Sequence, residues 1–243
     1  MIRRMLPVSG LAALTLLVAA CAGSSSTTDS SGASASPSGP SPENSGLIST
    51  PECGGTIAVM APLTGGDASL GQEQLNFAKL AVDDFNATNG GMYTILESDT
   101  MLDANQAKTQ SVAIAAENAV IGVVGPTASQ EVTAVGPTFK DAGIGFVSAS
   151  ATNPDLTNGS NPGFFRVVPT DAVQGPTDAA YIASTLGAKN VVIIEEETEY
   201  GKGLASSASE AFTADGVNVT SIRVAEDKKS YDDVIAKIAD NTD

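Results

Sequence analysis

Three short polar loops carry the residues best suited to bind a small ligand. Each of them, residues 62–71, 125–129 and 148–154, follows a short apolar segment. Ser129 stands where the second loop meets a helix, and free backbone N–H groups and the helix dipole favour an anion there. The third loop offers carbonyl oxygens and the Thr152 hydroxyl as acceptors for an ammonium group. An anion site beside an ammonium-accepting loop suits a zwitterion.

Simpler interpretations of these residues stay open. Ser129 is also a good N-cap residue, and 148–154 is also a plain connecting turn in which Pro154 arrests any helix. In a fourth segment, 195–201, the glutamates favour a solvated loop over a metal site, because the EF-hand spacing of carboxylates is missing. Tyr200 in that segment either covers a ligand with its ring or packs at a helix start.

An α/β scaffold is needed to bring these loops together. Apolar runs predict strands near 56–61, 93–97, 119–125, 144–147, 164–168, 190–194 and 217–224. Helical spacing predicts helices near 72–88, 103–117, 129–141, 172–186, 201–214 and 230–240, with Asp103 as the N-cap of the second. This alternation indicates a parallel sheet covered on both faces. Ligands of such sheets bind outside the carboxyl ends of the strands.

The regular pattern is interrupted at 170–175, between Pro169 and Pro176, which suggests a crossing between two lobes. We expect residues 53–168 to form a first lobe and residues 169–243 part of a second, with a hinge at about 168–175. Only two clear βα units follow the crossing, and an open sheet of two strands buries little apolar surface. The second lobe is therefore expected to be incomplete in this chain.

The N-terminus has the pattern of an export signal over residues 1–20. Arg3 and Arg4 precede an uncharged apolar run that is too short to span a bilayer. Its end, Val-Ala-Ala-Cys at 18–21, resembles the lipobox of bacterial lipoproteins, in which Cys21 would carry a diacylglyceryl group; the alternative is an ordinary secretory signal. Residues 21–52 are rich in Ser, Gly and Pro and predict a flexible tether. The folded part is then lipid-anchored on the extracytoplasmic face of the cell membrane.

Composition excludes several function classes. The 243 residues carry 12 Lys and Arg against 28 Asp and Glu, a net charge of −16, and no cationic cluster that could bind nucleic acid. No His is present, so no His-dependent triad forms, and two Cys cannot build a thiolate zinc site. Neither a GxSxG elbow nor a P-loop occurs. We expect a protein that is not an enzyme and uses no cofactor or metal.

The loops strongly resemble those of the leucine/isoleucine/valine-binding proteins, the type I periplasmic solute-binding family of ABC importers. The resemblance runs from about Gly55 to Asp243. It is carried by PLTGGDASLG (62–71), AKLAVDDFNATNGG (78–91), IGVVGPTAS (121–129), SASATNPDLT (148–157), FFRVVPTDAVQGP (164–176) and EYGKGLA (199–205). The fold that it implies has two doubly wound parallel-sheet lobes joined by a hinge.

The resemblance also implies roles for single residues. Ser129 would hold the carboxylate of an amino acid, and the Ser150 carbonyl and the Thr152 hydroxyl would hold its ammonium group. Ala151 lies between these two in the same binding loop. Leu70 occupies a position where relatives often place an aromatic that touches the ligand side chain. Tyr200 would approach from the second lobe; family members usually add an acid near the ammonium group from a part that this chain lacks. The predicted ligand site therefore consists of positions 70, 129, 150–152 and 200.

The expected function is that of a monomeric substrate-binding lipoprotein of an ABC transporter. It would trap an amino acid of the branched-chain type, or a similar small zwitterion or amide, between its lobes and deliver it to permease and ATPase subunits. The alternative is an extracytoplasmic sensor of the same fold that signals to a partner protein. Which amino acid is bound stays open, because the loops hold the ends that all amino acids share.

Overall fold

A computed structural model of the chain describes residues 54–226 and 228–239. The predictions for the export signal, for lipidation of Cys21 and for the tether lie outside these residues. Among the helices that are described, none combines the length and the apolar character needed to cross a membrane.

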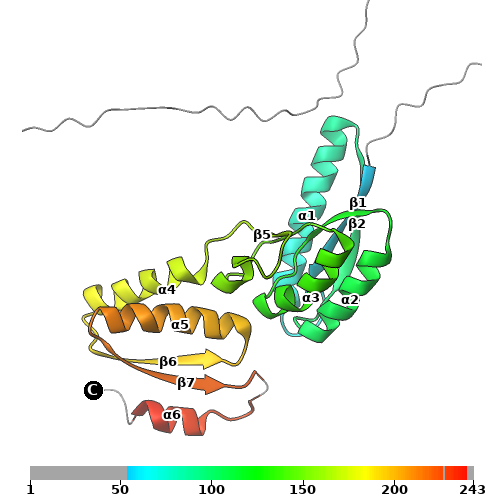
Figure 1. The fold of residues 1–243 in the computed structure, drawn as a ribbon. Helices are drawn as coiled ribbons and strands as arrows, with labels where there is room; N and C mark the ends of the chain where they lie inside the picture. Colours follow the sequence, from blue (N-terminus) through cyan, green and yellow to red (C-terminus); the bar gives the residue numbers. More distant parts are fainter. Residues whose placement is uncertain (1–53, 227, 240–243) are drawn as a thin grey trace, which may run out of the picture. The chain divides into compact units, whose positions relative to one another are not determined.

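The first lobe is built on a five-stranded parallel sheet with the strand order β2-β1-β3-β4-β5 (Figure 1). Its strands are β1 (Gly54–Ala61), β2 (Met92–Asp99), β3 (Val120–Val124), β4 (Phe146–Ser148) and β5 (Phe164–Arg166). They alternate with α1 (Ala68–Asn89), α2 (Ala104–Ala116), α3 (Ser129–Ala142) and the 3₁₀ turn η1 (Pro154–Thr157). All helices and strands predicted for this lobe form, and Asp103 caps α2 by accepting a hydrogen bond from the Gln106 N–H at 2.7 Å.

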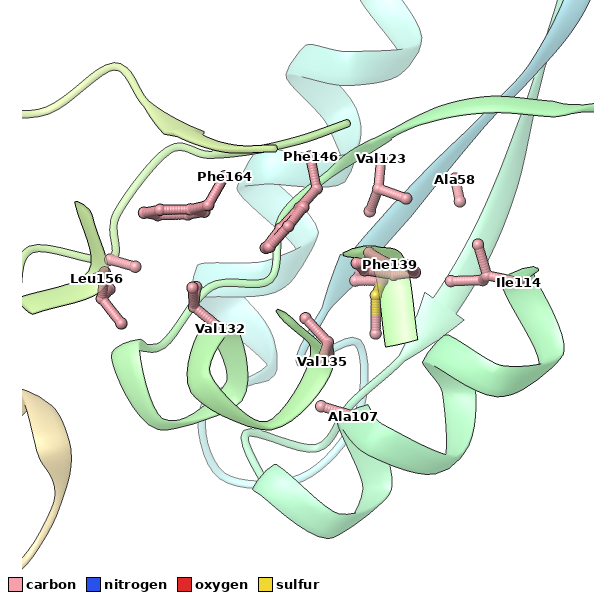
Figure 2. Packing of buried hydrophobic residues seen from close by; sticks show 12 residues of the cluster. Ala58, Ala107, Ile114, Val123, Val132, Val135, Phe139, Phe146, Leu156 and Phe164 are labelled. Carbon is pink, nitrogen blue, oxygen red and sulfur yellow. The ribbon is translucent and has the colours of Figure 1, made fainter. Parts of the chain in front are cut away.

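The main hydrophobic core lies between this sheet and the helices α2 and α3. Figure 2 shows Phe139 of α3, Phe146 of β4 and Phe164 of β5 in one layer with aliphatic side chains of α2 and α3. The ring centroids of Phe139 and Phe146 are 5.1 Å apart, and those of Phe146 and Phe164 are 5.3 Å apart. Because these residues are buried, the core fixes α3, and with it the residues at the start of that helix.

The opposite face of the sheet is covered less completely than the sequence predicts. Helix α1 packs on β1 and β2, and Leu75 is its one large hydrophobic residue that is fully buried. Beside α1, apolar hollows are lined by Ile57 and Val124, and Phe165 of β5 remains 63% exposed. The expectation of cover on both faces therefore holds only in part: α1 alone is too narrow for a sheet of five strands.

The second lobe contains a parallel pair of strands, in the order β6-β7, and is incomplete as predicted. Its elements are α4 (Asp171–Ala180), the π-helical turn η2 (Tyr181–Thr185), β6 (Asn190–Glu196), α5 (Glu199–Ala214), β7 (Asn218–Val224) and α6 (Asp232–Ala239). Helix α5 packs on both strands and α4 packs on α5 (Figure 1). A small core of Ala179, Phe212 and Val217 joins them.

Residues 170–175, where the sequence predicts a crossing between the lobes, contain the start of a helix, and the helix predicted near 172–186 forms as α4 followed by η2. Helix α4 begins at Asp171, and Pro176 lies inside it. Thr170 has an extended backbone, and its carbonyl accepts hydrogen bonds from the N–H groups of Val173 and Gln174, which starts the helix directly after β5. The predicted α/β class is confirmed: the chain forms two lobes with parallel sheets, and the second of them is incomplete.

Candidate functional site

Ser129 is the first residue of α3, one position after the N-cap residue. Ala128 occupies the N-cap position, and its N–H donates to Glu131 Oε2 at 2.7 Å, so the Glu131 carboxylate closes the helix start. The interpretation of Ser129 as the N-cap is therefore wrong. Its Oγ instead accepts a hydrogen bond from the Asn153 N–H at 3.3 Å, which links α3 to the loop after β4.

The approach to α3 requires a glycine at position 125. Gly125 has φ +110°, and a Cβ there would lie 2.1 Å from the Met60 carbonyl oxygen of β1. Since no other residue fits this position, β3 passes directly into the helix start with its backbone against β1. Across residues 54–226 and 228–239, no hydrogen bond uses the N–H groups of Ser129 and Gln130. Both are free to bind an anion.

The loop after β4 is an organised structure and not a plain turn. Ser148 Oγ donates to the Pro126 carbonyl at 2.6 Å and accepts from the N–H groups of Ser150 and Ala151 at 3.3 and 3.0 Å. Ser150 Oγ donates to the Thr127 carbonyl at 2.7 Å. The loops after β3 and β4 therefore form one hydrogen-bonded unit.

Arg166 of β5 holds the same loop from its other side. Its Nη1 donates to the Ala151 carbonyl at 3.1 Å and to the Asn153 carbonyl at 2.8 Å, while its Nη2 donates to Thr157 Oγ1 at 2.8 Å. Burial lowers the pKa of this guanidinium, and the charge of Asp171 opposes that change, so it stays cationic at neutral pH. The guanidinium and the Ser148 hydroxyl therefore both hydrogen-bond to the backbone of Ala151.

Gln74 of α1 completes the unit and was missed by the sequence analysis. Its Nε2 donates to Ser150 Oγ at 3.1 Å, and its Oε1 accepts from Thr127 Oγ1 at 2.9 Å. The residue stands inside an ordinary amphipathic helix, so no local signal in the sequence marks it. Only the fold brings α1 beside the other two loops.

Asp99, at the end of β2, organises the loop after β1. It accepts hydrogen bonds from the Leu63 N–H at 2.8 Å, from Thr64 Oγ1 at 2.5 Å and from the Met101 N–H at 3.0 Å. Burial acts to raise the pKa of this carboxyl, but the hydrogen bonds outweigh it, so the pKa is lowered. They also support Met101 and Leu102, whose φ angles are +53° and +60°.

The glycines of the first loop differ in their surroundings. A Cβ on Gly71 would lie 2.0 Å from the Pro62 carbonyl oxygen, so this glycine lets α1 pack against the end of β1. Gly65 and Gly66 have no atom within 4 Å of such a Cβ. Leu70 is the residue of this segment that lines the cavity described next.

A cavity of about 340 Å³ opens where these segments meet. Its lining contains five of the six residues predicted for the ligand: Leu70, Ser129, Ser150, Thr152 and Tyr200. Ala151 is not among the lining residues. The other lining residues are Leu102, Thr127, Ala128, Gln130, Gln174 and Glu196. A hollow of about 350 Å³ beside α1 is lined by aliphatic and aromatic side chains, without converging polar groups, so it is the weaker candidate for a zwitterion.

Carboxylates gather near the part of the cavity that α5 contributes. Tyr200 is the second residue of α5, and burial together with the charges of Asp171 and Glu196 raises the pKa of its phenol. The cavity thus has free N–H groups at the start of α3 and negative charge near Tyr200. Such a distribution is complementary to a molecule with an anionic and a cationic end.

The glutamates at 195–199 are only partly a solvated loop, which corrects that prediction. Glu195 and Glu196 belong to β6, and Glu195 is 7% exposed. It forms an ion pair with Arg223, its direct neighbour on β7, and this pairing explains why a carboxylate is tolerated there. Within the described ranges, no group of three or more acidic or Cys side chains could hold a metal ion.

Comparison with known proteins identifies the family of this chain. Residues 55–242 match the family described as periplasmic binding protein. A Leu/Ile/Val-binding protein of Rhizobium johnstonii is 33% identical over 168 residues, which are 67% of this chain and 45% of the relative. The leucine-specific-binding protein of Salmonella typhimurium is 28% identical over 191 residues, 75% of this chain and 50% of the relative. The chain spans about half the length of the curated relatives it matches.

Solved structures show the same fold. The branched-chain amino acid transporter substrate-binding protein LivJ of Streptococcus pneumoniae, in complex with isoleucine, has a TM-score of 0.68 and 26% identity, covering 76% of this chain and 53% of that one. The leucine-binding protein LivK of Thermotoga maritima has a TM-score of 0.72 and 24% identity, with 76% and 53% covered. The chain therefore belongs to the periplasmic binding protein family, within which it is similar to the leucine/isoleucine/valine-binding proteins.

Proposed function

We propose that this chain is the ligand-binding part of a substrate-binding protein of an ABC transporter. Its ligand is an amino acid of the branched-chain type, or a similar small zwitterion or amide, which it delivers to a membrane permease. A diacylglyceryl group on Cys21 anchors it to the extracytoplasmic face of the cell membrane. The names of the curated relatives, which refer to leucine, isoleucine and valine, support the ligand class.

The start of α3 in the 340 Å³ cavity is the observation that carries this proposal. The free N–H groups of Ser129 and Gln130 and the Ser129 hydroxyl form an anion site of the size of a carboxylate. All three groups belong to a helix that the main core holds in place, so the site needs no reorganisation before it binds.

The ammonium group of the ligand is assigned to the loop after β4. The Ser150 carbonyl and the Thr152 hydroxyl are its acceptors, and the negative charge near Tyr200 favours a cation there. Leu70 and Leu102 supply an apolar wall for the ligand side chain. Tyr200 covers the bound ligand from the second lobe. Ala151 shapes the loop between these two residues, because its N–H and carbonyl hydrogen-bond to Ser148 and Arg166.

Ligand binding is tested by thermal unfolding of the complete natural gene product, expressed without residues 1–21. Ligand that binds only the folded form stabilises it by about 2.7 kcal/mol at a hundredfold excess over Kd. We expect leucine, isoleucine or valine to raise Tm and lysine and glutamate to leave it unchanged, because the wall is apolar. If none of the twenty amino acids or their amides changes Tm, the proposed function is wrong.

Lipid anchoring is tested separately by labelling cells with radioactive palmitate. The natural protein is expected to incorporate label and to sediment with membranes, while the Cys21→Ser variant does neither. Cys53 is the only other cysteine in the chain, so Cys53→Ser is the matched control and is expected to retain the label. Equal labelling of the natural protein and Cys21→Ser would contradict the anchor.

A further inference from the structure

Asp171, the first residue of α4, is a buried carboxylate that the proposed function does not yet use. Its side chain is 0% exposed. Neither Oδ1 nor Oδ2 has a hydrogen-bond partner in the described part of the chain. A buried acid in this state is unusual, because removing a carboxylate from water without donors is costly. Burial accordingly raises the pKa of Asp171.

Thr152 lies directly beside this carboxylate. The Asp171 N–H donates to the Thr152 carbonyl at 3.0 Å, and the Thr152 hydroxyl is close enough to act against the rise in the Asp171 pKa. Thr152 Oγ1 is itself buried and, within residues 54–226 and 228–239, also lacks a hydrogen-bond partner. The two unsatisfied groups are therefore neighbours, with Thr152 on the cavity side.

The nearest cation does not neutralise Asp171 by contact. Arg166 acts on the carboxylate through its charge, but its guanidinium donates to the carbonyls of Ala151 and Asn153 and to Thr157. On the other side, a Cβ on Gly203 of α5 would lie 2.7 Å from Asp171 Oδ2, so α5 closes this direction. Thr152, whose carbonyl accepts from the Asp171 N–H, is a neighbour of this carboxylate that lines the cavity.

We propose that Asp171 is a positioning residue that makes Thr152 an acceptor for the ammonium group of the ligand. The carboxylate accepts the hydroxyl proton of Thr152, which leaves the lone pairs of Oγ1 for an N–H of the ligand. Its negative charge also attracts the ammonium group across one side chain. The inference rests on the proposed function and adds its ligand class: α-amino acids are selected over carboxylates of the same shape without an amino group.

The experiment compares two probes, L-leucine and 4-methylpentanoate, which is leucine without its α-amino group. Their Kd values are measured by titration calorimetry on the complete natural gene product and on Asp171→Asn. A lost hydrogen bond to a charged group weakens binding roughly 10- to 100-fold. We expect Asp171→Asn to weaken the binding of leucine by such a factor and to leave the binding of 4-methylpentanoate unchanged. The Kd of 4-methylpentanoate divided by the Kd of leucine then falls.

A double-mutant cycle with Thr152→Val tests whether the effect passes through the hydroxyl. Asp171→Asn is expected to weaken leucine binding less in the Thr152→Val background, where only the attraction between the charges remains, and to have its full effect in Thr152→Ser. Asp141→Asn removes the same charge from an exposed position near the end of α3 and is expected to change neither Kd.

Three outcomes count against the proposal in different ways. If the unsubstituted protein binds no amino acid, the proposed function and this inference both fail. If it binds leucine but Asp171→Asn weakens both probes equally, or neither, the positioning role alone is wrong. A variant that loses Tm yet retains the natural ratio of the two Kd values shows that Asp171 is structural only and also overturns the inference.

Discussion

Gln74 donates a hydrogen bond to Ser150 across 76 positions of sequence, with its Nε2 3.1 Å from Ser150 Oγ. Because its Oε1 also accepts from Thr127 Oγ1 at 2.9 Å, one side chain of α1 holds both loops that line the cavity. Neither loop can shift alone without breaking a bond to this amide. The amide therefore fixes the distance between the proposed carboxylate and ammonium sites.

Replacing Gln74 with alanine is expected to reduce both stability and ligand affinity. Two buried or half-buried hydrogen bonds are lost, and about 1–2 kcal/mol of unfolding free energy goes with them. Chemical denaturation and leucine titration of the same preparation measure the two effects. Glu73→Ala changes the neighbouring exposed position on α1 and should alter neither. Unchanged affinity in Gln74→Ala would mean that the loops are held by other contacts.

Ser129→Ala tests the anion site at the start of α3. The hydroxyl is a side-chain donor that α3 places beside its free N–H groups, so its loss should weaken the binding of leucine roughly 10- to 100-fold. The N-cap position is Ala128, so the helix itself should remain. Thr133→Ala, which removes a hydroxyl bonded to the Ser129 carbonyl within α3, is the control. Equal Kd values for Ser129→Ala and the unsubstituted protein would exclude a carboxylate contact by this residue.

Glu131→Gln is expected to stabilise the protein at neutral pH. Glu131 is 0% exposed, and burial, more than any other influence, raises its pKa above 4.5. The folded form then binds more protons than the unfolded form between 4.5 and the raised value, so stability falls as pH rises through that window. Glutamine avoids this loss and still accepts from the Ala128 N–H.

The measurement is the free energy of unfolding of both proteins at several pH values from about 4 to 7, across this titration. The advantage of Glu131→Gln should grow with pH and then become constant. Glu117→Gln removes a charge from an exposed position after α2 and should show no such trend. A difference that does not change with pH would mean that Glu131 has the same pKa in both states.

Gly203→Ala tests the contact of α5 with Asn153 and Asp171. A Cβ at position 203 would lie 2.7 Å from Asn153 Nδ2 and from Asp171 Oδ2. Alanine is favoured over glycine inside a helix by about 1 kcal/mol, so a loss of stability in this variant measures the clash. We expect Tm to fall, as recorded by circular dichroism. Gly66→Ala, where a Cβ meets nothing within 4 Å, is the control and should leave Tm unchanged. A rise of Tm in both variants would contradict the close packing of Gly203 against Asn153 and Asp171.

The elements and their order could be predicted because each carries its own local signal. The strands of the first lobe are apolar runs such as 56–61. Helix α1 ends at Asn89, directly before Gly90, which adopts a φ of +65°. Positions 129, 150 and 152 could be predicted as cavity residues because strand ends of a parallel sheet meet at one edge. Their roles toward a ligand stay predictions.

The contacts that the sequence could not reveal join segments that are far apart. Arg166 reaches the carbonyls of residues 151 and 153, and Glu195 is neutralised by Arg223 on the next strand. Whether a glutamate after a strand is solvated or buried depends on the residue opposite it, which local spacing does not encode. By contrast, the helix predicted near 172–186 forms as α4 followed by η2, with Pro176 tolerated inside it.

The hydrogen bonds of Arg166 hold the loop after β4 independently of the apolar wall of the cavity. The loop proposed to bind the part that all amino acids share is held by a guanidinium and a serine hydroxyl. Leu70 and Leu102, proposed to contact the ligand side chain, come from two other segments, after β1 and β2. Substitutions at these two leucines can therefore change the preference among amino acids, in evolution or in the design of a biosensor. The loop that would bind the ammonium group is left unchanged by them.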